Sequence, residues 1–290
     1  FSLAIVFAQV FNPIWFLQGL ENFKLISIIN ITSKSTYVIL VVLFITKNSD
    51  YIFVNLFLGL SAFIFNVLGL FYIKKKYCFK ILFPSFSEVK FILINDFSFC
   101  VSQLFLSVRQ LSPLLLIGYF LGFSVAGQYR VIEQIVNLFR TFSQVFLKFF
   151  YAQACYKFIT NTQNGWNYWK KYTIVNVSLI SVALLFLAFF STTVLRFFNL
   201  PEETVSKLNF LFKIGLIISF LMSINLPLEQ LMFIQNKNKI YVKITIFATI
   251  ATIVLILVLI NRFELFGIII SLIISEFIFI LFYFYNAFLH

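Results

Sequence analysis

Long apolar runs separated by short polar connectors fill almost the whole of this 290-residue chain. A helix needs about 20 mainly apolar residues to cross the hydrocarbon core of a bilayer. Only 11% of the residues are charged, against about 25% in a typical soluble domain. We therefore expect an all-α protein, a polytopic transmembrane helical bundle with about nine spans. The predicted spans are 1–17, 25–46, 51–73, 92–120, 128–151, 173–195, 209–231, 241–261 and 266–288.

Basic residues are distributed unevenly among the connectors. One alternating set of connectors carries twelve lysines, and the other set carries four basic residues. The positive-inside rule places the richer set in the cytoplasm. No connector is long enough to form a soluble basic domain, so nucleic acid is not an expected partner. The richer set consists of Lys24, Lys74, Lys75, Lys76, Lys80, Lys90, Lys157, Lys170, Lys171, Lys237, Lys239 and Lys243.

The predicted span 128–151 carries a stripe of polar side chains along its length. Its members are spaced by 4, 3, 4 and 4 residues, which places them on one face of a helix that turns about 100° per residue. They are Glu133, Asn137, Arg140, Gln144 and Lys148.

The predicted span 92–120 has a narrow apolar face and a wide polar face. Its apolar arc holds Leu93, Phe97, Cys100, Val101, Leu104, Val108, Leu111 and Leu115, and we expect this arc to face lipid or core. Outside the arc lie Asp96, Ser98, Ser102, Gln103, Ser107, Arg109 and Gln110.

Charged side chains within these two spans cannot all face lipid. Each charge at the bilayer centre costs about 2.5–3.5 kcal/mol, so the set would cost on the order of ten kcal/mol. The set is Asp96, Arg109, Glu133, Arg140 and Lys148; Lys34, Glu229 and Glu276 pose the same problem in other spans.

Two interpretations of the charged residues remain open. They can join helices, for example through a pair between Arg140 and Glu133 or Asp96. Alternatively, they can line a hydrated cavity, where an arginine fork would bind the oxygens of an anionic group such as phosphate. We predict a substrate cavity lined by Arg109, Arg140, Gln103, Gln110, Asn137, Gln144, Asp96, Glu133 and Lys148.

Motifs for catalysis, cofactors and metals are missing from the sequence. It contains no GxxxxGK[ST], HExxH or GxSxG pattern. Cys78, Cys100 and Cys155 lack CxxC spacing, and His290 is the one histidine. We expect no catalytic residue, metal site or cofactor.

A weak internal repeat relates residues 12–60 to residues 225–275. In each copy an Asn and a Pro precede a polar connector, an apolar span, a short polar turn and another span. Duplicated halves are common among secondary transporters, but chance similarity between hydrophobic segments is an alternative explanation.

Three segments of the chain resemble the O-antigen flippases, in the polysaccharide-transporter branch of the multidrug/oligosaccharidyl-lipid/polysaccharide exporter superfamily. The segments are "NPIWFLQGLENFKLISIIN" (12–30), "SVRQLSPLLLIGYFLGFSVAGQYRVIEQIVNLFRTFSQV" (107–145) and "NLPLEQLMFIQNKNKIYVK" (225–243). The resemblance implies two six-helix bundles around a central cavity. Residues 1–80 would be the C-terminal half of the first bundle and residues 81–290 the second bundle, with three further spans before Phe1.

The resemblance also implies a function and its partners. The chain would be a bacterial inner-membrane flippase for oligosaccharide repeat units on undecaprenyl diphosphate, working among membrane lipids beside polysaccharide polymerase and assembly proteins. Arg109 and Arg140 would hold the diphosphate or an acidic sugar. Gln103, Gln110, Asn137 and Gln144 would bind sugar hydroxyls. Asp96 and Glu133 would tune the arginines or carry a coupling cation, H⁺ or Na⁺, although Ser112 stands where the family often has an acidic residue.

Two other functions are compatible with a chain of this kind. A related multidrug exporter would share the fold but would need a more apolar, acid-lined cavity. A membrane glycosyltransferase, such as an O-antigen polymerase or ligase, would need a large periplasmic loop with catalytic basic residues. The longest connector predicted on that side, near 196–208, is short for such a loop.

Overall fold

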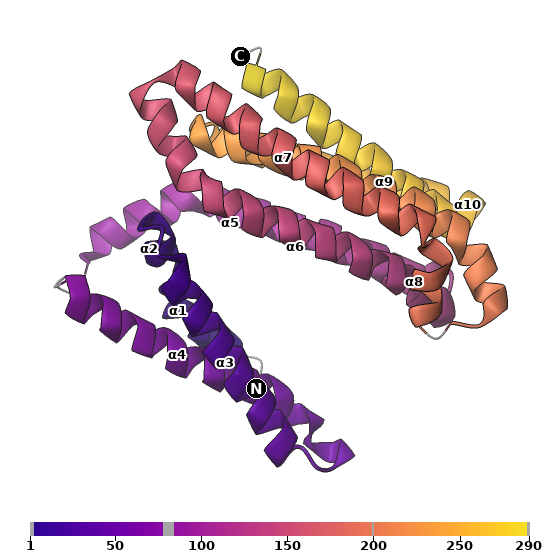
Figure 1. Cartoon of the computed structure of the whole chain (residues 1–290), viewed down its shortest axis with the longest axis horizontal. Helices are drawn as coiled ribbons and strands as arrows, with labels where there is room; N and C mark the ends of the chain where they lie inside the picture. The colour runs from indigo at the N-terminus through magenta and orange to yellow at the C-terminus, as the bar shows by residue number, and fades with distance from the viewer. Residues whose placement is uncertain (1–2, 78–83, 199, 289–290) are drawn as a thin grey trace. The chain divides into compact units, whose positions relative to one another are not determined.

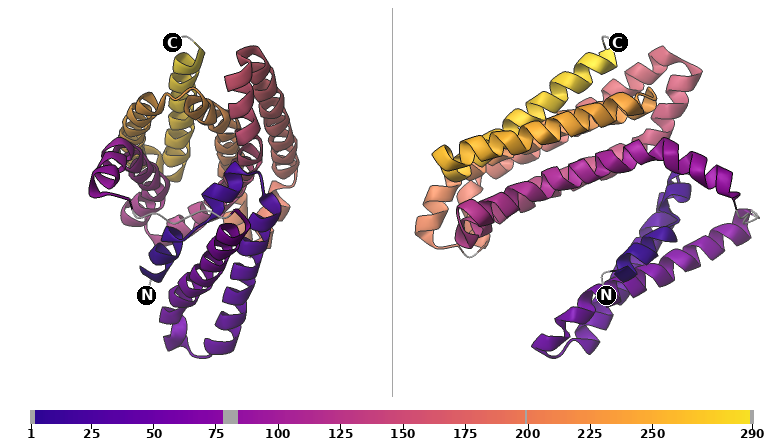
Figure 2. Two further views of the ribbon diagram at one scale, coloured as in Figure 1. Left: turned by 90° about the vertical axis from the view of Figure 1, so that its left-hand side faces the viewer. Right: turned by 180° about the vertical axis from the view of Figure 1, so that it is seen from behind.

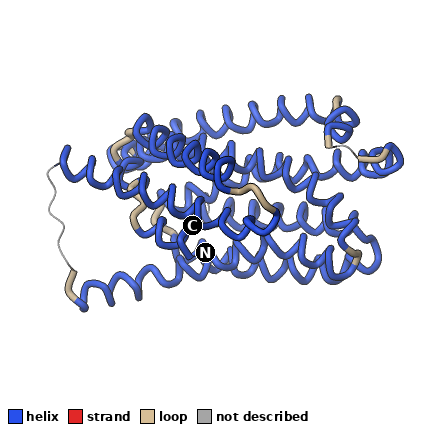
Figure 3. The backbone as a smooth tube through the Cα atoms, turned by 90° about the horizontal axis from the view of Figure 1, so that it is seen from below, coloured by secondary structure: helices blue, strands red, loops and turns tan. Residues whose placement is uncertain are grey.

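The fold is helical throughout the described part of the chain. The computed structural model describes residues 3–77, 84–198 and 200–288, with backbone alone for residues 48, 49, 51, 95, 96 and 98. These residues form ten α-helices and one 3₁₀ helix and contain no strand (Figure 3). The chain divides into two compact units, Phe1–Ser85 and Phe86–His290. The predicted all-α class is confirmed.

Unit 1 is built from helices that pair around α4. It contains α1 (Leu3–Val10), α2 (Ile14–Gly19), α3 (Phe23–Phe44), the 3₁₀ helix η1 (Asn48–Phe53) and α4 (Val54–Tyr77) (Figure 1). The α1 helix packs close to α4 at Gly59. A Cβ atom at this position would come within 2.6 Å of the Ala4 backbone, so the glycine permits the close approach. The side chain of Asn66 donates to the Ala8 carbonyl oxygen at 2.8 Å.

The prediction of one continuous span over 1–17 is wrong. The helix α1 ends at Val10, and α2 begins at Ile14, whose N–H is bound by the Asn12 side chain at 3.0 Å. Pro13 between them has no N–H to continue a helical hydrogen-bond ladder, so the chain breaks there.

Unit 2 consists of long helices that run side by side (Figure 2). They are α5 (Phe86–Phe120), α6 (Phe123–Thr160), α7 (Thr162–Phe189), the short α8 (Ser191–Phe197), α9 (Glu202–Ile234) and α10 (Asn238–Phe288). The α10 helix contains both predicted spans 241–261 and 266–288. It reverses direction at Glu264, where φ is +47° and ψ is −131°.

Six of the described helices are long and apolar enough to cross a membrane: α3, α4, α5 over Phe99–Phe120, α7, α9 and α10. The α6 helix, which carries the predicted polar stripe, is not among them. The α10 helix counts once although it holds two of the nine predicted spans.

The α9 helix forms the centre of unit 2. Its buried side chains lie all round the helix, from Val205 to Met232, as expected for a helix surrounded by other helices. A Cβ atom at Gly215 would lie 2.6 Å from the Ile132 side chain, so this glycine allows α6 to approach closely.

Pro227 interrupts the hydrogen bonding of α9, and the neighbouring α7 compensates for it. Proline lacks an N–H, so the carbonyl of Ser223 loses its helical partner. Asn176 on α7 donates to this carbonyl at 3.2 Å, and the Trp169 indole donates to the Pro227 carbonyl at 3.2 Å. Side chains of adjacent helices commonly satisfy backbone groups that proline frees in membrane helices.

In both copies of the weak internal repeat the helix within or before the polar connector ends in the same type of turn, α2 in the first copy and α9 in the second. Glu21 and Asn236 both have positive φ, 54° and 56°. The next N–H in each case bonds five residues back, from Asn22 to Leu17 and from Lys237 to Met232, both at 2.9 Å. This pattern is the Schellman motif, a common helix ending that both copies share.

We predict that Asn176 and Pro227 are energetically coupled. Asn176→Leu leaves the Ser223 carbonyl without a partner and should lower the free energy of unfolding by about 1 kcal/mol. In a Pro227→Ala background the restored N–H bonds that carbonyl, so Asn176→Leu should cost less by at least about 0.5 kcal/mol. Reversible unfolding in lipid bicelles measures both values. Additive effects would contradict the assignment.

Candidate functional site

A small polar cavity lies inside unit 2. Its volume is about 30 Å³, enough for about one water molecule. The lining comes from four helices: Arg109, Gln110 and Pro113 of α5; Tyr129, Ile132, Glu133, Val136, Asn137 and Arg140 of α6; Ile218 and Met222 of α9; and Leu272 and Glu276 of α10.

A buried ion pair joins α5 to α10 at one wall of the cavity. The Arg109 guanidinium donates to a Glu276 carboxylate oxygen at 2.5 Å, and the two side chains are 10% and 1% exposed. The ring of Phe279 lies 4.5 Å from the guanidinium carbon, in a cation–π contact. The charge of Arg109 is therefore compensated by its own chain.

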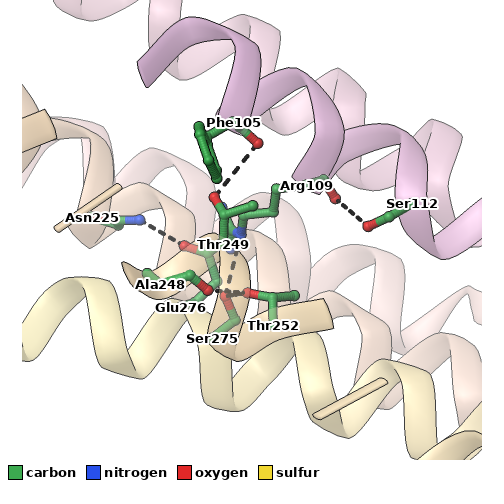
Figure 4. Close-up of polar contacts among 9 residues, drawn as sticks. All are labelled: Phe105, Arg109, Ser112, Asn225, Ala248, Thr249, Thr252, Ser275 and Glu276. Carbon is green, nitrogen blue, oxygen red and sulfur yellow. Dashed lines mark hydrogen bonds and ion pairs between the residues drawn. The ribbon is translucent and has the colours of Figure 1, made fainter. Parts of the chain in front are cut away.

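Hydrogen bonds extend this ion pair in two directions (Figure 4). Asn225 of α9 donates to the second Glu276 oxygen at 2.7 Å. The Arg109 Nε–H donates to the Ser275 hydroxyl at 3.2 Å, and Ser275 lies 2.5 Å from Thr252. Because Thr252 donates to the Ala248 carbonyl at 2.6 Å, Ser275 must donate to Thr252. The network fixes both charged groups among α5, α9 and α10.

A second helix-internal proline, Pro113 of α5, lies beside the site, in addition to Pro227 of α9. It removes the N–H that would bond the Arg109 carbonyl. The Ser112 hydroxyl lies 3.5 Å from that carbonyl and donates to it over this longer distance. Pro113 thus lies about one helical turn after Arg109, and Pro227 lies two residues after Asn225.

The polar stripe of α6 divides into two parts. Glu133, Asn137 and Arg140 line the cavity, whereas Gln144 and Lys148 are exposed on the surface of unit 2. Glu133 accepts a hydrogen bond from Arg130, one turn earlier, at 2.7 Å. The pairing of Arg140 with Glu133, one of the two pairings left open by the sequence, does not occur. Arg140 has no ion pair within 4.0 Å among the described residues.

The predicted residues of α5 are also separated. Arg109 and Gln110 line the cavity. Gln103 is exposed and does not line the cavity. The side chain of Asp96 lies outside the described residues. The apolar arc faces outward, since Leu93, Leu104 and Leu115 are 64%, 65% and 69% exposed, while Ser102 and Arg109 on the other side are buried.

Three residues that complete the site were not among the nine predicted ones. Glu276, Asn225 and Ser275 bind Arg109 directly or through its partner. Glu276 alone gave a signal in the sequence, as an acid inside the apolar run 266–288. Asn225 and Ser275 gave none, because uncharged polar residues occur in many spans.

No set of three or more His, Cys, Asp and Glu side chains gathers in the described part of the chain in a way that could hold a metal ion. The two carboxylates that line the cavity are separately paired, Glu276 with Arg109 and Glu133 with Arg130.

A family model described as "Polysaccharide biosynthesis protein" matches residues 1–148, just over half of the chain. The chain belongs to this polysaccharide biosynthesis protein family. All nine predicted site residues fall within the matched segment, whereas Asn225, Ser275 and Glu276 lie beyond it. No curated protein sequence matches the chain.

The fold is that of a MATE transporter. The solved structure titled "Crystal structure of MATE in complex with MaL6" superposes with a TM-score of 0.79 at 14% sequence identity. The superposition covers 98% of this chain and 67% of that one. Both comparisons fall in the superfamily that the three sequence segments resemble, so this polysaccharide biosynthesis family member is a multi-pass membrane protein with a transporter fold.

We predict that Arg109 and Glu276 depend on each other for stability. Arg109→Leu and Glu276→Leu should each lower the free energy of unfolding by about 3–5 kcal/mol, because each leaves an uncompensated buried charge. The double variant should lose much less than the sum. Unfolding in bicelles measures this coupling.

The Arg130–Glu133 pair provides a matched control. It also joins an arginine to a glutamate, but Arg130 is 51% exposed. The same cycle there should give a coupling of about 1 kcal/mol or less. Equal coupling in the two cycles would contradict the assigned role of the buried pair.

Proposed function

We propose that this protein is a flippase that moves oligosaccharide repeat units linked to undecaprenyl diphosphate across the bacterial inner membrane. The observation that carries the proposal is Arg140, a guanidinium that lines an internal cavity without an ion pair in the described part of the chain. The other charges of that cavity are matched, Arg109 by Glu276 and Glu133 by Arg130. An anionic group entering the cavity would supply the missing partner.

Arg140 suits a diphosphate because its planar fork can bind two oxygens at once. Gln110 of α5 and Asn137 of α6 line the same cavity and would bind sugar hydroxyls. Gln103, Gln144 and Lys148 are exposed on unit 2 and would meet the cargo only outside this cavity. Asp96 and Glu133 are proposed carriers of a coupling cation, H⁺ or Na⁺.

The cavity is far too small for such a cargo in this structure. A volume of about 30 Å³ compares with about 300–1,000 Å³ for ordinary ligand pockets. Transport therefore requires α5 and α6 to separate from α9 or α10. In alternating access one bundle moves against the other, so the helices of unit 2 would have to rearrange in addition to that movement.

We assign the two units to the two bundles of such a transporter. Unit 2 would be the complete second bundle, with α5, α6, α7, α9 and the two parts of α10 as its six helices. Unit 1 would be the C-terminal half of the first bundle. Polysaccharide polymerase and assembly proteins would receive the cargo on the outer side.

The two alternatives have less support. A multidrug exporter shares the fold, but it would favour a cavity with unpaired acids, and both glutamates of this cavity are paired with arginines. A glycosyltransferase is disfavoured because the family and the fold are those of transporters.

We predict that Arg140→Ala lowers surface polysaccharide about ten- to a hundredfold in a flippase-deficient strain that expresses the full-length protein. Loss of a charged hydrogen-bond partner costs about 1.5–3 kcal/mol, which corresponds to that range. Quantitative immunoblotting of surface polysaccharide, normalised to membrane protein, measures the effect.

Arg196→Ala is the matched control. Arg196 pairs with Glu202 at 3.0 Å, but its side chain is 62% exposed and lies away from the cavity, so export should stay within twofold. Full export by Arg140→Ala would overturn the proposal. Loss of drug resistance with unchanged polysaccharide would favour the exporter alternative.

A further inference from the structure

A second cavity lies between the end of α6 and the start of α7, apart from the site described above. Its volume is about 670 Å³. The α6 residues that line it are Phe146, Phe150, Lys157 and Thr160, and the α7 residues are Asn164, Asn167, Tyr168, Lys171, Tyr172 and Val175. We call it the α6–α7 groove.

The two ends of the α6–α7 groove differ in character. Lys157, Thr160, Asn164 and Asn167 lie near the connector between the helices. Lys171 directly precedes Tyr172, whose ring stacks on Phe150, so it lies at the boundary between the polar part and the aromatic part of the groove. The α6 and α7 segments that continue away from this connector contribute Phe146, Phe150, Tyr172 and Val175. One end is therefore basic and polar, and the other end is aromatic and apolar.

The walls of the groove are held in place by contacts within unit 2. The rings of Phe150 and Tyr172 stack 5.4 Å apart at 8°. The Tyr172 hydroxyl donates to Gln230 at 2.7 Å, and Gln230 donates to the Leu147 carbonyl at 2.8 Å. The apolar end is thus a preformed surface.

The positive charge of the groove is not compensated by nearby acids. No Asp or Glu occurs between Glu133 and Glu202, a stretch with six basic residues. Lys157 lies 3.7 Å from the centre of the Tyr168 ring, a contact that positions the ammonium without neutralising it. Neither Lys157 nor Lys171 forms an ion pair among the described residues.

We propose that the α6–α7 groove binds an anionic phospholipid. Lys157 and Lys171 would bind the phosphate, Asn164 and Asn167 would donate to its oxygens, and an acyl chain would lie along Phe146, Phe150 and Val175. Basic pockets between membrane helices on the cytoplasmic side bind anionic headgroups in this way. The positive-inside rule places the α6–α7 connector on that side. This site is distinct from the cargo cavity and does not depend on the proposed function.

A matched pair of lysines tests the proposal. Lys171 lines the groove, whereas its neighbour Lys170 does not, and both are exposed. Native mass spectrometry of the full chain in detergent, titrated with dioleoyl phosphatidylglycerol or phosphatidylcholine, measures lipid binding. Lys171→Gln should weaken phosphatidylglycerol binding about fivefold, the equivalent of about 1 kcal/mol per basic residue.

The other variants and the second lipid distinguish a specific lipid-binding site from a general electrostatic attraction to anionic lipid. Lys157→Gln combined with Lys171→Gln should weaken phosphatidylglycerol binding by more than tenfold, whereas Lys170→Gln should change it by less than twofold. Wild-type protein should prefer phosphatidylglycerol to phosphatidylcholine. Equal effects of Lys170→Gln and Lys171→Gln, equal binding of the two lipids, or displacement of lipid by millimolar inorganic phosphate would overturn the proposal. Polysaccharide export tests the cargo cavity separately.

Discussion

Hydrocarbon offers no hydrogen-bond partner, so polar groups inside a membrane bundle must be satisfied by the protein. The Arg109–Glu276 pair shows how unit 2 meets this constraint. Asn225 donates to the second carboxylate oxygen. Ser275 accepts a hydrogen bond from the Arg109 Nε–H and donates one to Thr252. Asn176 likewise binds the Ser223 carbonyl that Pro227 frees. These bonds fix the positions of α5, α7, α9 and α10.

Against this background, basic groups that line a cavity without an ion pair in the described residues have functional meaning. Arg140 is such a group inside unit 2, and Lys157 and Lys171 are such groups at its surface. Each lies at a cavity with polar and apolar walls. The same electrostatic argument therefore leads to two different ligands, an anionic cargo in the small cavity and an anionic phospholipid in the α6–α7 groove.

Local features of the sequence predicted the long helices, the outward arc of α5 and the polar face of α6, because helical periodicity depends on neighbouring residues alone. The partner of Arg109 could not be predicted in this way, since Glu276 is 167 residues away and no local pattern relates them. The sequence left a pair between Arg140 and Glu133 open, whereas in the structure Arg130, three residues before Glu133, takes that place. The prediction of one span over 1–17 failed because the apolar run was counted straight through Pro13, where the helix breaks.

The central claim is that the stripe of α6 borders water during transport and not acyl chains. Substituted-cysteine labelling tests it in the full-length protein with Cys78, Cys100 and Cys155 replaced by serine. Asn137→Cys lies on the cavity wall, and the adjacent Leu138→Cys replaces a side chain that is 59% exposed on the outer face. A charged, membrane-impermeant thiol reagent should label position 137 at least about tenfold faster than position 138, because a cysteine thiol in hydrocarbon neither ionises nor is reached by the reagent. Labelling of position 138 at the same rate as position 137, or faster, would contradict the account.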